Sequence, residues 1–238
     1  MKRTRIKICC IASLAEARLA IAQGADALGL VGAMPSGPGN IDDDMIARIA
    51  TSVGPPVATF LLTSETGADG IIAHARRCRA NVLQLVDRVA PRDHVLVREA
   101  LPGVKLVQVV HVTGPESVGE AEAAAPHVDA LLLDSGDPTA AVRLLGGTGR
   151  THDWSISRRI VDAVDAPVFL AGGLRPDNVA QAIREVRPFG VDLCTGVRTD
   201  GRLDPVKLHA FVDAVMAAGA GRADLQQDDL RGNAVSGG

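Results

Sequence analysis

Eight short apolar runs recur along the chain, and a segment with helical patterning follows each of them. The runs are nearly continuous stretches of β-branched residues and leucine, which is typical of strands buried on both faces of a parallel sheet. They lie at residues 6–10, 27–31, 57–62, 82–86, 105–110, 130–134, 168–172 and 191–194. Helical patterning follows Ser13 and Arg175 and fills 42–52, 67–79, 89–100, 115–125, 154–164 and 204–217.

This alternation predicts an α/β fold, a single-domain (β/α)8 TIM barrel over residues 1–217. The chain length of 238 residues suits such a barrel. A doubly wound open sheet is the alternative, but it usually has fewer strands, and no Gly-x-Gly-x-x-Gly follows the first strand. Residues 218–238 are rich in small and polar residues, so we expect a disordered C-terminal tail there.

The composition excludes several classes of protein. A formal charge of −3 and an aromatic content of 2%, with no tyrosine, disfavour a nucleic-acid-binding surface. The first apolar run breaks at Ser13 and Glu16, and no run is long enough to span a membrane. The four cysteines show no Cys-x-x-Cys spacing, so we expect neither a zinc site nor a disulfide framework, and a cytoplasmic location.

Chemically active residue types end two of the predicted strands. In a (β/α)8 barrel the active site lies where strands end and the following loops begin. Cys9 and Cys10 end the first run, and Asp134 ends the sixth. Because side chains alternate between the two faces of a strand, we expect one of the two cysteines to face the pocket and the other to pack.

Two glycine-containing turns follow the seventh and eighth strands. Loops at these positions bind phosphate in many such barrels, because their backbone N–H groups reach the anion. Gly172 and Gly173 follow one strand, and Thr195 and Gly196 follow the other. They predict a phosphate site; a plain tight turn at the glycine pair is the alternative.

The connection after the sixth strand, DSGDPTAAVRLLGGTGRTHDWS, is long for a strand-to-helix loop. Loops of this length without secondary structure are usually functional or disordered. We therefore expect its GGTGRTHDW end to form a lid over the site. Asp153 within it can equally serve as the N-cap of the next helix.

Four groups of motifs resemble those of the phosphoribosylanthranilate isomerase family. They are KICCI, ALLLDS with GGTGRTHDW, AGGLRPDNV and VRPFGVDLCTGV, and they occur in family order between residue 5 and about residue 215. The resemblance implies an Amadori rearrangement in tryptophan biosynthesis. N-(5-phosphoribosyl)anthranilate would become 1-(2-carboxyphenylamino)-1-deoxyribulose 5-phosphate.

The resemblance also assigns roles to residues. It implies that Cys9 is the general base, that Asp134 is the general acid, and that no metal or cofactor takes part. The phosphate clamp would comprise Gly172, Gly173, Thr195, Gly196, and Gly147 and Thr148 in the lid. The partner would be a small phosphorylated sugar, and the chain a monomer or homodimer.

Three departures from the family pattern concern the aryl side of the pocket. KICC replaces the usual KICG, and GAMPSGPGNI at 32–41 has no arginine where the family holds the anthranilate carboxylate. QLVD replaces QLHG, and Gln108 stands where a lysine is usual. Gln84, Gln108 and His111 are therefore possible substrate-binding residues, although a lone histidine is more often structural.

Two other functions stay open at this point. A related sugar-phosphate isomerase or lyase would use the same acid and base on another phosphorylated substrate, and the missing arginine favours it. A non-catalytic barrel that binds a phosphorylated ligand is disfavoured, because a binding protein needs no paired acid and base. A substrate screen separates these possibilities.

Overall fold

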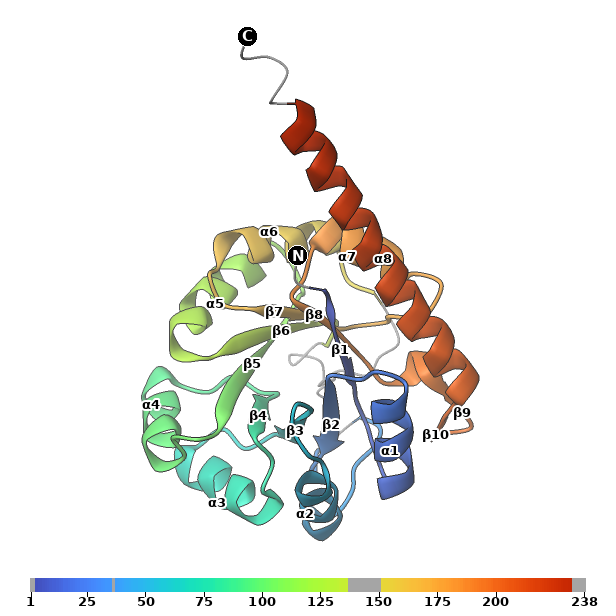
Figure 1. Ribbon diagram of the computed structural model, residues 1–238. Helices are drawn as coiled ribbons and strands as arrows, with labels where there is room; N and C mark the ends of the chain where they lie inside the picture. The colour runs from blue at the N-terminus through green and yellow to red at the C-terminus, as the bar shows by residue number, and fades with distance from the viewer. Residues whose placement is uncertain (1–2, 36, 137–150, 233–238) are drawn as a thin grey trace.

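The computed structural model describes residues 3–35, 37–136 and 151–232 of the chain (Figure 1). Within these ranges, eight parallel strands follow one another in sequence order and close into a barrel, β8 pairing with β1. The strands are β1 Arg5–Ile8, β2 Ala27–Val31, β3 Ala58–Thr63, β4 Val82–Leu85, β5 Lys105–His111, β6 Ala130–Asp134, β7 Val168–Leu170 and β8 Gly190–Leu193. The predicted TIM barrel is confirmed.

Helices form a ring around the strands (Figure 1). They are α1 Leu14–Ala22, α2 Asp43–Ser52, α3 Ala68–Cys78, α4 Pro91–Ala100, α5 Ser117–Ala124, α6 Trp154–Ala163, α7 Val179–Val186 and α8 Pro205–Gly232. Short 3-10 turns, η1 Ala125–His127 and η2 Thr195–Val197, and a small hairpin of β9 Arg198–Thr199 and β10 Arg202–Leu203 complete the described elements. Helix α8 thus continues well past residue 217, and residues 233–238 lie outside the described ranges.

Several helices begin where the sequence provides a side-chain cap. Ser13 precedes α1 and its side chain accepts a hydrogen bond from the backbone N–H of Glu16, as the capping spacing indicates. Asp42 caps α2 in the same way, and Asp153 caps α6 by accepting from the N–H of Ser155. The cap role considered for Asp153 is therefore confirmed.

The core has two parts, divided by the barrel wall. Between strands and helices lies a large apolar cluster that includes Leu106 and Val110 of β5. Inside the barrel lies a smaller cluster that includes Val107 and Val109 of the same strand, and also Cys9. Successive side chains therefore point alternately outward and inward, and the inward set continues up to the open end of the barrel.

No helix among the described residues is long and apolar enough to cross a membrane.

Candidate active site

A pocket opens at the carboxyl ends of the barrel strands, where the fold predicts the active site. Residues that follow or end β1, β4, β6, β7 and β8 line it, as do residues of the loop after β2. Most of the residues predicted for catalysis and binding meet there: Cys9, Gln84, Asp134, Gly172, Gly173 and Thr195. The chain brings them together from both ends of the sequence because β8 closes the barrel against β1.

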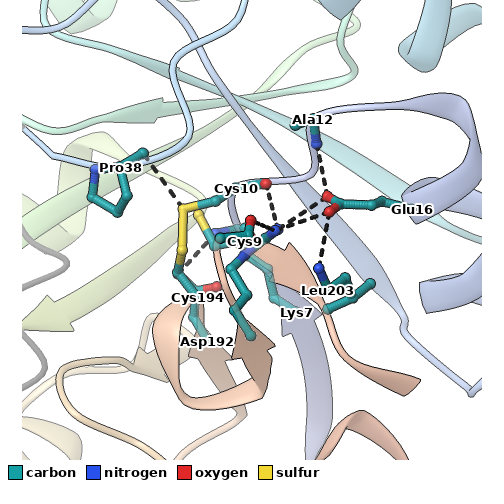
Figure 2. The surroundings of a disulfide bond; sticks show 11 residues. Lys7, Cys9, Cys10, Ala12, Glu16, Pro38, Asp192, Cys194 and Leu203 are labelled. Carbon is teal, nitrogen blue, oxygen red and sulfur yellow. Dashed lines mark hydrogen bonds and ion pairs between the residues drawn. A yellow bond between two sulfur atoms is a disulfide. The ribbon is translucent and has the colours of Figure 1, made fainter.

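Cys9 lies beside a buried ion pair at the base of this pocket (Figure 2). Lys7, two residues earlier on the same face of β1, places its Nζ 2.8 Å from the Oδ2 of Asp192 on β8. Burial raises the pKa of the Cys9 thiol to about 11, and the charge of Asp192 adds to this while that of Lys7 opposes it. The resting thiol is therefore protonated at neutral pH, and its thiolate is a strong base.

Gly29 of β2 provides the space that these side chains occupy. A Cβ at this position would lie 2.6 Å from the Cys9 Sγ and 3.0 Å from the Lys7 Nζ. The first distance is shorter than a Cβ contact can be, so any side chain here would displace the Cys9 thiol, and the second leaves Lys7 tightly packed. The absence of a side chain at Gly29 is therefore part of the site.

Asp134 ends β6 and lines the same pocket. One of its carboxylate oxygens accepts a hydrogen bond of 2.7 Å from the backbone N–H of Ser135. Burial nevertheless raises the pKa of the Asp134 carboxyl above its ordinary value. A raised pKa keeps a proton on this group at higher pH than usual, as a general acid requires.

The turns after β7 and β8 lie close together, and their backbone conformation and close contact both require glycine. Gly172 and Gly173 have φ angles of +85° and +63°, which few residues other than glycine adopt. A Cβ at Gly196 would clash with the carbonyl oxygen of Leu174. Gly172, Gly173 and Thr195 line the pocket, whereas Gly147 and Thr148 fall outside the described residues.

The three polar residues considered for substrate binding lie in different places. Gln84 lines the pocket, and its buried Oε1 has no hydrogen-bond partner within the described part of the protein. Gln108 instead points outward from the barrel: its amide donates to the carbonyls of Leu85 and Asp87, and its Oε1 faces His94 of α4. The Gln108 side chain therefore lies outside the pocket, where it is hydrogen-bonded to the protein's own backbone.

His111 also lies outside the group of residues that line the pocket. Its Nε2 donates to the carbonyl oxygen of Val86 at 3.0 Å. The register of β5 and β6 pairs it with Asp134, so it sits next to the acid without opening onto the cavity. Its buried Nδ1 has no hydrogen-bond partner within the described ranges, so a substrate-binding role for His111 stays a prediction.

Cys10 forms a disulfide with Cys194 (Figure 2). The expectations that the chain has no disulfide and that Cys10 merely packs are both wrong. Cys194 lies 184 residues further along, and spacing rules detect only cysteines that are close in sequence. Cys10 also has a φ of +61°, a conformation that suits the glycine found here in the family pattern.

Lys7, Gly29 and Asp192 also belong to the site, and they are not among the residues predicted from the sequence. A period-2 reading of β1 provides a signal for the first, because Lys7 must share the inward face with Cys9. A lysine without exposed area inside a barrel needs a counter-ion, and Asp192 is a buried acid on the neighbouring strand. Gly29 gives no such signal, since its importance depends on what packs across from it.

Asp43, His74 and Cys78 form a separate cluster on α2 and α3, and their ligand-type atoms lie within 4.8 Å of one another. Two of these side chains, Asp43 and His74, already bond to other groups of the protein. Asp43 accepts from Arg77 and contacts His74, whose other ring nitrogen bonds Thr63. These contacts join α2 to α3, so the cluster is explained by helix packing.

The chain matches the family described as N-(5'-phosphoribosyl)anthranilate (PRA) isomerase over residues 6–214. It is 39% identical over 216 residues to the N-(5'-phosphoribosyl)anthranilate isomerase of Haloferax volcanii, covering 90% of this chain and 92% of that protein. The crystal structure of the phosphoribosylanthranilate isomerase of Thermus thermophilus superposes with a TM-score of 0.76 at 26% identity, covering 90% and 99% of the two chains.

A second solved isomerase of this kind holds reduced 1-(o-carboxyphenylamino)-1-deoxyribulose 5-phosphate and superposes with a TM-score of 0.74 at 26% identity. It covers 90% of this chain and 99% of its own. The match thus spans the barrel and every strand end that lines the pocket. The chain belongs to the N-(5'-phosphoribosyl)anthranilate isomerase family.

Proposed function

We propose that Cys9 and Asp134 are the general base and general acid of the isomerase reaction, and that the turns after β7 and β8 hold the substrate phosphate. The reaction follows from family membership: the chain is an aldose–ketose isomerase of tryptophan biosynthesis. The observation that carries the residue roles is the meeting of a buried thiol and a buried carboxyl in one pocket at the strand ends.

The first step opens the furanose ring of N-(5-phosphoribosyl)anthranilate. Asp134 donates its proton to the ring oxygen as the C1–O bond breaks, and the nitrogen lone pair forms the Schiff base. Burial raises the pKa of the Asp134 carboxyl, so it keeps this proton to a higher pH than an ordinary aspartate does.

The second step removes the proton on C2. The Schiff base makes this proton acidic, and the Cys9 thiolate takes it to give the enol-amine, which then tautomerises to the amino-ketose. A thiol with a pKa of about 11 is scarce as thiolate but strongly basic once formed. The ammonium group of Lys7, which favours the thiolate, acts as a positioning group for this base.

The phosphate and the aryl group are expected at different walls. The backbone of Gly172, Gly173 and Thr195 offers N–H groups to the phosphate. On the side of β2, β3 and β4 the pocket is lined by Met34, Leu62 and Gln84. An apolar wall suits an aromatic ring, and the Gln84 amide is available there for its carboxylate.

The test is a fluorescence assay of phosphoribosylanthranilate consumption by wild-type protein and by Cys9→Ala, Asp134→Asn and Cys78→Ala. Loss of a general base or acid should lower turnover by about 10²-fold or more in the first two variants. Cys78 is a buried free cysteine on α3, so its variant controls for loss of a buried thiol. Unchanged turnover in Cys9→Ala would contradict the assigned base.

A related sugar-phosphate isomerase or lyase activity remains the second candidate, because among the described residues no lysine, arginine or histidine lines the pocket. It predicts a particular outcome of the same assay. The folded protein would then bind inorganic phosphate but leave phosphoribosylanthranilate unchanged, and a panel of ribose phosphates would be the next substrates.

A further inference from the structure

Figure 2 shows the disulfide between Cys10 and Cys194. Both cysteines line the pocket, so the bond forms part of its wall. Cys10 follows β1, one residue after the proposed base, and Cys194 follows β8, one residue before Thr195. The bond therefore links the loop that carries the base to the turn assigned to the phosphate. Its position makes its redox state relevant to substrate binding.

The loop after β2 is shaped around Cys10. A Cβ at Gly39 would lie 2.5 Å from the Cβ of Cys10, so this glycine leaves room for the cysteine side chain. The Sγ of Cys10 also lies 3.6 Å from the carbonyl oxygen of Pro38. A cysteine at position 10 is thus accommodated by a second loop, and three loops of the pocket meet at the bond.

The Cys10 side of the bond is held in place by other contacts. The guanidinium of Arg198 donates to the carbonyl oxygens of Cys9 and Cys10 and is itself paired with Glu16 at 3.0 Å. Glu16 also accepts from the backbone N–H of Ala12. These bonds remain when the disulfide opens, so the loop after β1 keeps its place.

The Cys194 side is anchored further along, because Arg198 directly follows the short turn Thr195–Val197 and holds the end of that turn on the loop after β1. Cys194 is partly exposed, and it precedes the short turn Thr195–Val197 without any side-chain cap. Its disulfide is the covalent tie between this turn and the loop after β1. Opening the bond therefore gives freedom mainly to Cys194 and the exposed Thr195, which lie between β8 and the anchored end of the turn.

We propose that the Cys10–Cys194 disulfide is a reversible thiol–disulfide exchange site that sets the affinity of the pocket for the substrate phosphate. The proposal rests on the phosphate role proposed above for the turn after β8. With the bond closed, the turn is preorganised; with the bond open, part of the binding free energy is spent on ordering it. The catalytic pair is held by β1 and β6, so turnover changes little.

The exchange requires a dithiol reductant. Its thiolate attacks the Sγ of Cys194, which is more exposed than Cys10, and the S–S bond breaks with Cys10 leaving as a thiolate that takes up a proton. The second thiol of the reductant then displaces Cys194 as a thiol and leaves as a cyclic disulfide. Two electrons pass from the reductant to the protein. In a reducing cytoplasm, disulfides are usually transient and regulatory, which suits this reversibility.

The first test counts free thiols in the full-length protein after denaturation. After purification without reductant and mild oxidation with oxidised glutathione, two of the four cysteines, Cys9 and Cys78, should react. After dithiothreitol all four should react. Peptide mapping should join the segments that contain Cys10 and Cys194, and four reactive thiols in the oxidised sample would overturn the proposal.

The second test compares binding and turnover in the two redox states. Reduction should raise the KM for phosphoribosylanthranilate and the Kd for inorganic phosphate about 3- to 10-fold, with kcat within about twofold. Cys194→Ser and Cys10→Gly open the bond from opposite ends, and both should resemble the reduced wild type and ignore dithiothreitol. Cys78→Ser is the matched control and should respond to reduction as the wild type does.

The outcomes separate this inference from the proposed function. Turnover that is unaffected by reduction, together with a constant Kd for phosphate, overturns the switch and leaves the isomerase assignment intact. A redox-dependent Kd for phosphate without any turnover supports the switch and contradicts the proposed roles of Cys9 and Asp134.

Discussion

Two walls of the pocket differ in the kind of residue they present. The wall made by β1, β6 and β8 carries Cys9, Asp134 and Asp192, with Lys7 beneath them. The wall made by β2, β3 and β4 presents Val31, Met34, Leu62 and Gln84. Ionisable groups are thus concentrated at the wall where we propose proton transfer, and the opposite wall is apolar apart from one amide.

The difference teaches that the two walls are stabilised by different means. The ionisable wall depends on mutual compensation, because a buried charge is costly unless a partner lies close by. The apolar wall depends on packing and presents one polar group for recognition. Changing a residue in the first wall should therefore affect folding or turnover, and changing one in the second should affect the KM.

Removing the buried ammonium group of Lys7 is expected to have the largest effect, and it acts on the free energy of unfolding. Lys7→Met leaves the carboxylate of Asp192 buried without its counter-ion, which costs about 3–5 kcal/mol in the free energy of unfolding. Urea unfolding followed by circular dichroism measures this loss. Since burial already raises the pKa of Asp192, the loss should shrink as the pH falls and this carboxylate takes up a proton.

A second lysine–aspartate pair provides the control. Lys105 and Asp129 lie 3.0 Å apart, but the lysine side chain is 67% exposed. Lys105→Met should therefore change the free energy of unfolding by about 1 kcal/mol or less. Equal losses in the two variants would show that the Lys7–Asp192 pair is no more important to the fold than a surface ion pair.

The buried thiol should react slowly with an alkylating reagent. At pH 8 an exposed thiol is about one-quarter ionised, whereas a thiol with a pKa of about 11 is about one-thousandth ionised, a difference of about 200-fold. In Cys78→Ala, the rate of Cys9 alkylation by iodoacetamide should still rise between pH 9 and pH 10. A plateau of this rate below pH 9 would mean that the charge of Lys7 lowers the pKa of Cys9 by more than burial raises it.

The sequence predicted the barrel well because its signal is redundant. Every strand of the barrel overlaps one of the eight apolar runs, and strands such as β2 and β6 have the predicted bounds. Burial on both faces makes each run unmistakably apolar. The same property hides which residues point inward, and this is why Gln108 could not be distinguished from a pocket residue.

The site was predictable at its strand ends and much less so in its long-range pairs. Cys9 and Asp134 are conspicuous because they end apolar runs, where barrels place catalysis. The Lys7–Asp192 pair and the Cys10–Cys194 bond join β1 to β8, so they exist only once the barrel closes. Sequence distance of about 185 residues gives no local pattern for such contacts.

Gly29→Ala should disturb the ionisable wall without adding or removing a charge. Its methyl group would lie 2.6 Å from the Sγ of Cys9, so the thiol must move. We expect kcat to fall at least about 10-fold, since small displacements of a catalytic group are costly. Gly54→Ala, at a site with open space, is the control for an added methyl group. Wild-type kcat in Gly29→Ala would place the reacting base elsewhere.

Gln84 is where the apolar wall can be tested for recognition, and the expected effect is the smallest. Its buried Oε1 has no hydrogen-bond partner in the part of the chain that the structure describes, and its amide lines the pocket. If the amide donates to the anthranilate carboxylate, Gln84→Leu should raise the KM about 5-fold, and Gln84→Glu should raise it further through like-charge repulsion. Gln108→Leu should lower the Tm but leave the KM unchanged, because that amide bonds Leu85, Asp87 and His94 on the outer side of the strands. A KM that is unchanged in both Gln84 variants would show that the carboxylate is bound elsewhere, and the difference between the two walls would then concern proton transfer alone.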